Sequence, residues 1–161
     1  MNAAAKASCQ LIERALQKSP AYKKIDGGLY VVKQGSSIVM INVLPWGTDR
    51  AVVRVAAQLV KGVTMEVPLA LRLLEMNALL RFGAFAYVPT GDVIIFCHTI
   101  LGGKTMDREE LLATIKDVAI IADEYDDRIA ARYGGQTMQD LMEESVVEHF
   151  RTAHGKDHFK T

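Results

Sequence analysis

The side chains best suited to chemistry are few, and their spacing favours structural roles. Cys97 and His98 are neighbours in a predicted strand, so their side chains point to opposite faces and cannot form a local thiol–imidazole pair. We interpret His98 as structural. His149, His154 and His158 lie near the C-terminus without the spacing of a closed zinc site and without a nearby cysteine. We interpret these three as surface histidines, with adventitious metal binding as the alternative.

A second group of candidate residues is the run of carboxylates Asp123, Glu124, Asp126 and Asp127. On a helix, Asp123 and Asp127 are neighbours, and Glu124 can pair with Arg128. Such a cluster could hold a divalent cation, because hard cations prefer oxygen ligands. The solvated polar face of an amphipathic helix is the commoner origin of this pattern, and it is the interpretation that we favour.

The cysteines and glycine pairs indicate no reaction either. Cys9 and Cys97 are far apart and neither belongs to a CxxC pair, so we expect ordinary thiols, with a disulfide or redox role as the alternative. Gly27-Gly28 and Gly102-Gly103 lack the flanking pattern of a phosphate-binding loop and are interpreted as turn glycines. No order of Ser, His and Asp suggests a nucleophile. The sequence therefore predicts no catalytic residue, no metal site, no cofactor and no enzyme.

Composition narrows the classes of partner. The chain has 161 residues, with 19 Lys plus Arg against 19 Asp plus Glu, so its net charge is zero. Neutrality argues against nucleic-acid binding through phosphates. The first residues contain no continuous apolar segment of a signal peptide, so we expect a cytoplasmic protein without a membrane partner. One domain over residues 1–150 and a flexible polar tail over 151–161 are predicted.

A helix predicted from about Glu66 to Phe82 dominates the middle of the chain. Pro68 fits its first turn, where the missing N–H would have no partner anyway. Its apolar residues fill more than one stripe, which is typical of a buried helix or of one that packs on a partner subunit. We predict a homodimer with part of this helix at the interface. The proposed contacts are Leu69, Leu73, Met76 and Leu80.

The remaining elements give an α+β fold in the order α-βββ-α-ββ-α-α. We expect an antiparallel sheet of about five strands with helices mainly on one face. Asp107 and Glu110 resemble a capping box at the start of the long helix, and Thr137 is a plausible cap of the last one. The other predicted ranges are helix Asn2–Lys18, strands Leu29–Gln34, Ser37–Leu44, Arg50–Lys61, Ala84–Val88 and Val93–Leu101, a long helix ending at Gly134-Gly135, and a last helix to about Phe150.

Both faces of the sheet are predicted to be apolar around the hairpin. Ile94, Phe96 and Ile100 share one face of their strand, while Val93, Ile95 and Cys97 share the other. By the same alternation, Val52 and Val60 lie on one face of the Arg50–Lys61 strand, with Arg54, Ala56 and Gln58 between them. The helices after the hairpin can cover one face only. The N-terminal helix, a second subunit or a partner segment must cover the other.

Four segments, in this order and spacing, resemble the YbjN-like family, which shares its fold with type III secretion chaperones. They are LLEMNALLRFGAF (Leu73–Phe85), GDVIIF (Gly91–Phe96), MDREEL (Met106–Leu111) and IADEYDDRI (Ile121–Ile129). The resemblance implies the type III secretion chaperone-like fold, frequent homodimers, and apolar sheet and helix patches that hold extended client segments. It carries no catalytic residue over to this chain.

We therefore predict a non-enzymatic module that binds a protein or peptide, chaperone-like or regulatory. The alternatives are a signalling regulator that acts indirectly on expression, and an enzyme or metal protein with an unrecognised site. Trp46, in a Pro-Trp-Gly segment, either caps the edge of the core or anchors a contact. The proposed partner-binding residues are Val52, Val60, Ile94, Phe96 and Trp46.

Overall fold

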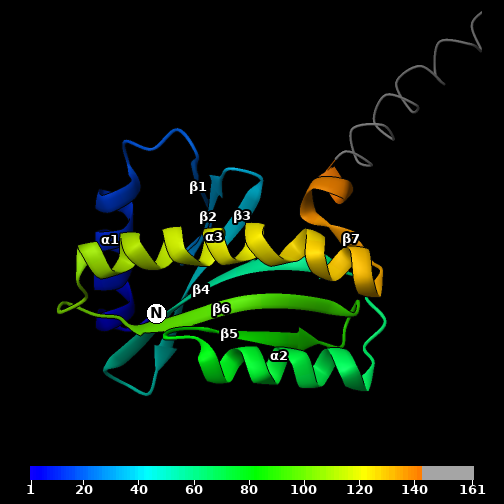
Figure 1. The fold of residues 1–161 in the computed structure, drawn as a ribbon. Helices are drawn as coiled ribbons and strands as arrows, with labels where there is room; N and C mark the ends of the chain where they lie inside the picture. The colour runs from blue at the N-terminus through cyan, green and yellow to red at the C-terminus, as the bar shows by residue number, and fades with distance from the viewer. Residues whose placement is uncertain (143–161) are drawn as a thin grey trace, which may run out of the picture.

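The computed structural model describes residues 1–142 and shows one antiparallel sheet with three long helices. Figure 1 shows α3 running across the sheet, α1 at one end of it, and α2 along the β5 side. The helices are α1 (Ala3–Leu16), α2 (Val67–Leu79) and α3 (Arg108–Tyr133). The strands are β1 (Tyr22–Asp26), β2 (Leu29–Gln34), β3 (Ser37–Trp46), β4 (Arg50–Lys61), β5 (Ala84–Val88), β6 (Val93–Leu101) and β7 (Gln136–Thr137).

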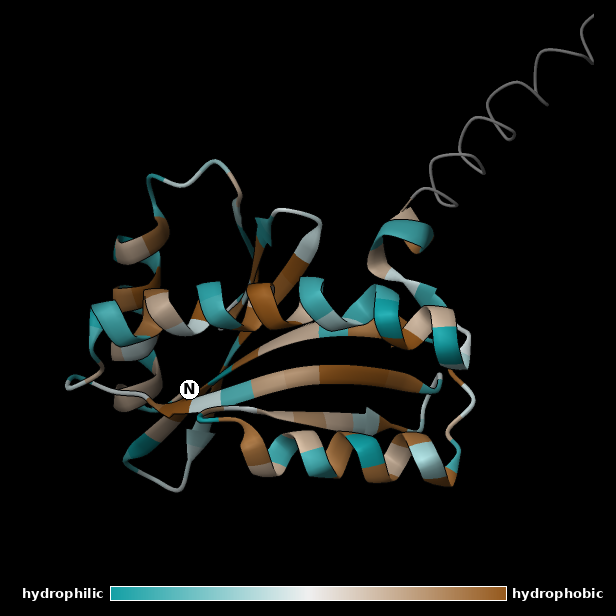
Figure 2. Ribbon diagram, viewed as in Figure 1, coloured by the Kyte–Doolittle hydropathy of each residue, from teal (hydrophilic) through white to brown (hydrophobic). Residues whose placement is uncertain are grey.

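The sheet has the strand order β1-β2-β3-β4-β6-β5, and the short β7 pairs with the end of β4. Every pairing is antiparallel, as predicted. The long strands β4 and β6 form the centre, where Figure 2 shows a strongly apolar ribbon. The edges of the path are β1 and β5.

The predicted α+β class is confirmed, and four strands have the predicted bounds, but the predicted number of strands is too small. Both missing strands lack an apolar signal. In β1 the sequence YKKID is polar and almost wholly exposed, as an edge strand can be. In β7 only two residues pair with β4. Neither segment has the alternation by which a half-buried strand is predicted.

Helices α1 and α3 pack on the same face of the sheet and α2 lies along the edge strand β5, so the prediction of helices mainly on one face is confirmed. The inward stripe of α3 includes Leu111, Ile115 and Val118, and that of α1 includes Ile12 and Leu16. These residues form one core with the sheet residues that point toward the helices. They are Tyr30, Val32, Val39, Ile41, Val43, Val53, Val55, Ile94, Phe96 and Ile100.

Side chains define the helix ends much as the sequence indicates. Asp107 accepts a hydrogen bond from the Glu110 backbone N–H at 2.8 Å and begins α3, and Gly134 ends it. Thr137 accepts from the Asp140 N–H at 3.2 Å, while the Asp140 carboxylate accepts from the Thr137 N–H at 2.8 Å. This reciprocal cap begins a helix whose described part is 138–142. The rest of the predicted last helix and the predicted tail lie outside the described residues.

A bulge in β4 overturns one predicted facing. Gln58 is opposite Ile95 on β6, but Val60, two residues later, is opposite the very next partner, Ile94. Leu59 is therefore an extra residue, and side-chain alternation changes phase there. Val60 points toward the helices and is fully buried. The prediction that Val60 shares a face with Val52 is wrong for this reason.

The pair Gly102-Gly103 packs closely against α1. The buried Ser8 hydroxyl accepts a hydrogen bond from the Gly103 N–H at 2.7 Å. A Cβ on Gly102 would lie only 2.5 Å from that hydroxyl oxygen. Glycine is therefore required for close approach between this turn and α1, which supports the interpretation as turn glycines.

Candidate functional site: the uncovered face of the sheet

The face of the sheet opposite the helices is covered by no described element. On this face Met40 is 43%, Trp46 50% and Leu101 67% exposed, which is a high value for each of these side chains. Leu44 is also exposed, Val52, Ile95 and Cys97 are half-buried, and the small Ala56 is buried. We call these residues the open face: Met40, Leu44, Trp46, Val52, Ala56, Ile95, Cys97 and Leu101, with Arg54 among them.

Strand register gathers these residues into cross-strand rows. Leu44 on β3, Val52 on β4 and Leu101 on β6 form one apolar row. Met40, Ala56 and Cys97 form another. Between the two rows lies a polar one, in which Arg54 is paired with Asn42 on one side and Thr99 on the other. Since side chains directly opposite one another are in contact, the rows form a continuous surface.

Two arginines place positive charge beside this apolar surface. A guanidinium nitrogen of Arg54 donates to the Cys97 sulfur at 3.3 Å. The guanidinium of Arg50 lies over the Trp46 ring, 4.4 Å from its centroid. An apolar surface of this kind can hold aliphatic or aromatic side chains. The guanidinium groups beside it can donate hydrogen bonds to carboxylates or backbone carbonyls.

Although Cys97 lies on an apolar strand, it is not buried, because its face of the sheet carries no helix. Cys97 and Cys9 are both half-buried free thiols. His98 does lie on the opposite face, as predicted, where its Nδ1 accepts from the Gly83 N–H at 3.0 Å. That hydrogen bond and an edge contact with Phe82 make His98 structural.

Trp46 is the last residue of β3 rather than a loop residue, and at 50% exposure it caps no core. Of the two interpretations, a contact anchor is the one that this position favours. Val52 is half-buried on the same open face. These two proposed partner-binding residues therefore lie where a partner could reach them.

The other three proposed partner-binding residues need correction. Val60, Ile94 and Phe96 are fully buried beneath the helices. The Phe96 ring packs edge-on against Phe82 and Phe85, with centroids 6.2 Å and 5.1 Å away. They are core residues, because the helices cover the face that includes Ile94 and Phe96 and the bulge turns Val60 onto it.

The proposed dimer contacts on α2 also face their own chain. Leu69 and Leu73 are buried, and Met76 and Leu80 pack against the core. Asn77 fixes this orientation, since its side-chain amide donates to the Phe85 carbonyl at 3.1 Å and accepts from the Phe85 N–H at 2.7 Å. The opposite stripe of α2 is the exposed one. It consists of Val67, Leu71, Leu74 and Ala78, with Leu79 beside it.

The remaining candidates have ordinary roles. Glu124 pairs with Arg128 at 3.5 Å, as predicted, and Asp123 accepts a hydrogen bond from Ser36. Within residues 1–142 no group of His, Cys, Asp and Glu has the arrangement of a metal site. No described helix is long and apolar enough to cross a membrane. His149, His154 and His158 lie outside the described residues.

Comparison with known proteins agrees with this architecture. The chain matches a chain of the crystal structure of the ExsC–ExsE complex with a TM-score of 0.58 at 16% identity, over 80% of this chain and 97% of that one. At that identity the likeness establishes the fold. No curated protein sequence matches. The family model described as "T3SS (YopN, CesT) and YbjN peptide-binding chaperone 1" matches residues 8–141. The chain therefore belongs to this family of peptide-binding chaperones.

Proposed function

We propose that this protein is a non-enzymatic chaperone that binds an extended, apolar segment of a client protein on the open face. The observation that carries the proposal is the apolar row of Leu44, Val52 and Leu101. This row lies on the face of the sheet that no described helix covers. Large exposed apolar patches mark interaction sites in soluble proteins. Membership of a peptide-binding family supports the class of ligand.

The energetics favour a segment rather than a small molecule. Removing apolar surface from water is worth roughly 25 cal/mol per Å², so a wide, shallow patch needs a ligand that covers several rows at once. An extended segment spans several rows and places alternate side chains on the patch. One chain of the ExsC–ExsE complex has a similar fold, and that structure is a complex of two proteins, which is consistent with a protein partner here.

The test is selection of peptides from a random display library on the wild-type protein, followed by binding measurements on variants. Leu101→Asp and Val52→Asp place a charge on the open face without removing a core residue. Ile120→Asp is the matched control, because Ile120 is a 50% exposed apolar residue on α3. We expect apolar peptides whose affinity falls about tenfold or more in the first two variants and stays unchanged in the control.

Two outcomes contradict the proposal. One is a set of selected peptides that bind Leu101→Asp and Val52→Asp as tightly as wild type. The other is a loss of peptide affinity in Ile120→Asp as large as in the two open-face variants. Circular dichroism of each variant separates loss of binding from loss of fold.

We further propose that the protein forms a homodimer through the exposed stripe of α2. Val67 is 72%, Leu74 64% and Leu79 83% exposed, although α2 is firmly attached to β5 by Asn77. A second copy presents the same stripe, so an isologous contact between two α2 helices would bury both. A cytoplasmic location and the absence of a membrane or nucleic-acid partner stay predictions from composition.

A further inference from the structure

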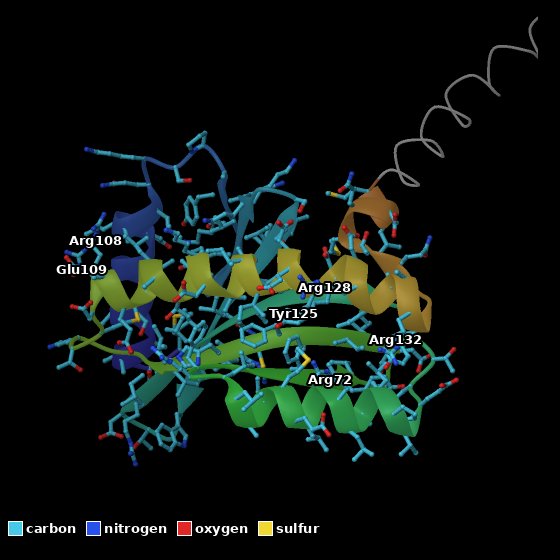
Figure 3. All side chains as sticks on the ribbon, viewed as in Figure 1. Arg72, Arg108, Glu109, Tyr125, Arg128 and Arg132 are labelled. Atoms are coloured by element: carbon cyan, nitrogen blue, oxygen red, sulfur yellow. The ribbon has the colours of Figure 1, made fainter. Side chains whose placement is uncertain are left out.

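A second surface, on the helix side of the molecule, also combines apolar side chains with arginines, but it is a narrow groove between two helices. A groove of about 190 Å³ runs between α2 and the C-terminal half of α3. Figure 3 shows Arg72 on α2 below this gap, and Tyr125, Arg128 and Arg132 on α3 above it. The lining residues are Leu69, Arg72, Leu73, Met76, Tyr125, Arg128, Ile129, Arg132 and Tyr133.

The periodicity of the two helices produces an apolar floor with a cationic rim. On α3, Tyr125, Arg128, Ile129 and Arg132 recur at steps of three and one, which places them on one helical face. Leu69, Leu73 and Ile129 are buried, whereas the three arginines are exposed. The ionisable side chains that line the groove include three arginines and no carboxylate.

The arginines are only weakly engaged within the chain. Arg72 approaches Glu75 at 3.6 Å and Arg128 approaches Glu124 at 3.5 Å, and all four side chains are solvent-exposed. Exposed pairs of this kind contribute little to stability, so a better-placed carboxylate can replace Glu75 or Glu124 as the partner. The Arg132 guanidinium lies 5.5 Å from the Tyr133 ring centroid and makes no ion pair within residues 1–142.

The size of the groove limits what enters it. Pockets for small-molecule ligands usually measure roughly 300–1,000 Å³, and this one is smaller. It has room for about one large side chain. Apolar contact below and guanidinium groups at the rim fit one leucine-sized anchor flanked by carboxylates, because arginine binds carboxylates through two parallel hydrogen bonds.

We propose that this groove binds an acidic peptide segment of a partner protein, with an apolar anchor between α2 and α3 and its carboxylates on Arg72, Arg128 and Arg132. The site goes beyond the open face and does not depend on the binding proposed there. The chain's own residues 143–161 begin Glu143-Glu144-Ser145-Val146-Val147-Glu148 and share this chemistry, so they are a competing occupant.

The experiment measures fluorescence anisotropy of a labelled peptide of alternating Glu and Leu with the full chain. We expect binding that weakens with salt, and that falls on the order of tenfold in Arg132→Glu and in Arg128→Glu, since each substitution removes a charged hydrogen bond to the peptide and adds like-charge repulsion. Arg108→Glu is the matched control, because Arg108 is exposed at the other end of α3 and lines no part of the groove. Arg108→Glu should bind as wild type.

Control peptides identify the chemistry. Replacing Glu by Gln, or Leu by Gly, should each weaken binding, because either the carboxylates or the anchor is then missing. Equal binding of the Glu and Gln peptides would overturn the proposal, as would equal loss in Arg108→Glu. If the peptide binds only after the chain is truncated at Met142, the chain's own C-terminal residues compete for the groove. That result would overturn the proposal of a partner segment. Loss in Leu101→Asp with no loss in Arg132→Glu would place the peptide on the open face instead.

Discussion

At the residue scale, Glu13 joins α1 to the first two strands. Its carboxylate pairs with Lys24 of β1 at 2.7 Å and accepts from the Tyr30 hydroxyl of β2 at 3.0 Å. The hydrogen bond from Lys24 lowers the pKa of Glu13, with burial opposing it and Tyr30 reinforcing it. Burial raises the pKa of Tyr30, so this hydroxyl stays a donor at neutral pH.

This arrangement predicts a pH dependence of stability. Because the folded-state pKa of Glu13 lies below the unfolded value of about 4.5, its contribution is complete above that value and disappears as pH falls through the lower folded pKa. Urea unfolding of wild type and Glu13→Gln at pH 7 and pH 3 measures it. We expect the variant to be less stable at pH 7 and to lose less stability on acidification. An identical pH dependence in both proteins would contradict this role.

Single residues also show where sequence reasoning reaches its limit. Alternation correctly separates Cys97 from His98, and Val52 from Val53, because period two holds within a regular strand. It fails at Val60, since one bulged residue at Leu59 reverses every later facing. Nothing in the run AAQLVK marks the bulge, which arises from pairing with β6 and β7.

At the element scale, β4 provides a direct comparison of two valines that the sequence does not distinguish. Val60→Asp places a carboxylate in the core, which costs several kcal/mol, so we expect it to unfold the protein or lower its midpoint severely. Val52→Asp should change the free energy of unfolding by about 1 kcal/mol or less, because the open face is accessible to water. Thermal melts followed by circular dichroism test this, and equal destabilisation would mean that the two faces are equally enclosed.

For helix α2, too, the sequence does not tell which side faces the core. Its two apolar stripes are visible in the sequence, and a partly buried, partly available helix follows from them. Leu69, Leu73 and Met76 have the same spacing as Val67, Leu71 and Leu74, so the sequence alone cannot say which stripe faces inward. Contacts with β5, above all those of Asn77, decide the orientation.

At the scale of the whole molecule, the predicted uncovered face is present, and one of its predicted covers is excluded. The N-terminal helix α1 packs on the same side as α3, so of the three covers predicted from the sequence a second subunit and a partner segment remain for the open face. The family resemblance predicts the fold class well, because the long apolar strands and amphipathic helices are marked clearly in the sequence, whereas the strand order in the sheet could not be predicted. The faces that remain free depend on long-range packing.

The proposed homodimer through the exposed stripe of α2 can be tested by its mass in solution. Light scattering behind a sizing column should give a dimer mass at tens of micromolar, and Leu74→Asp should reduce it to the monomer because it charges the exposed α2 stripe. Ile120→Asp, with its exposed position on α3, should stay dimeric. A wild-type monomer, or a dimer insensitive to Leu74→Asp, contradicts the proposed interface.

Protection of Cys97 from maleimide is the most direct test of peptide binding on the open face, because this thiol lies within that face. In a Cys9→Ser variant, the rate of maleimide labelling reports on Cys97 alone, and a selected apolar peptide is added to saturation, verified by anisotropy. If the peptide binds on the open face, labelling of Cys97 should slow in proportion to the bound fraction. The Cys9 thiol of a Cys97→Ser variant should label at an unchanged rate. Undiminished labelling of Cys97 in the saturated complex would show that the peptide binds elsewhere and would contradict the account.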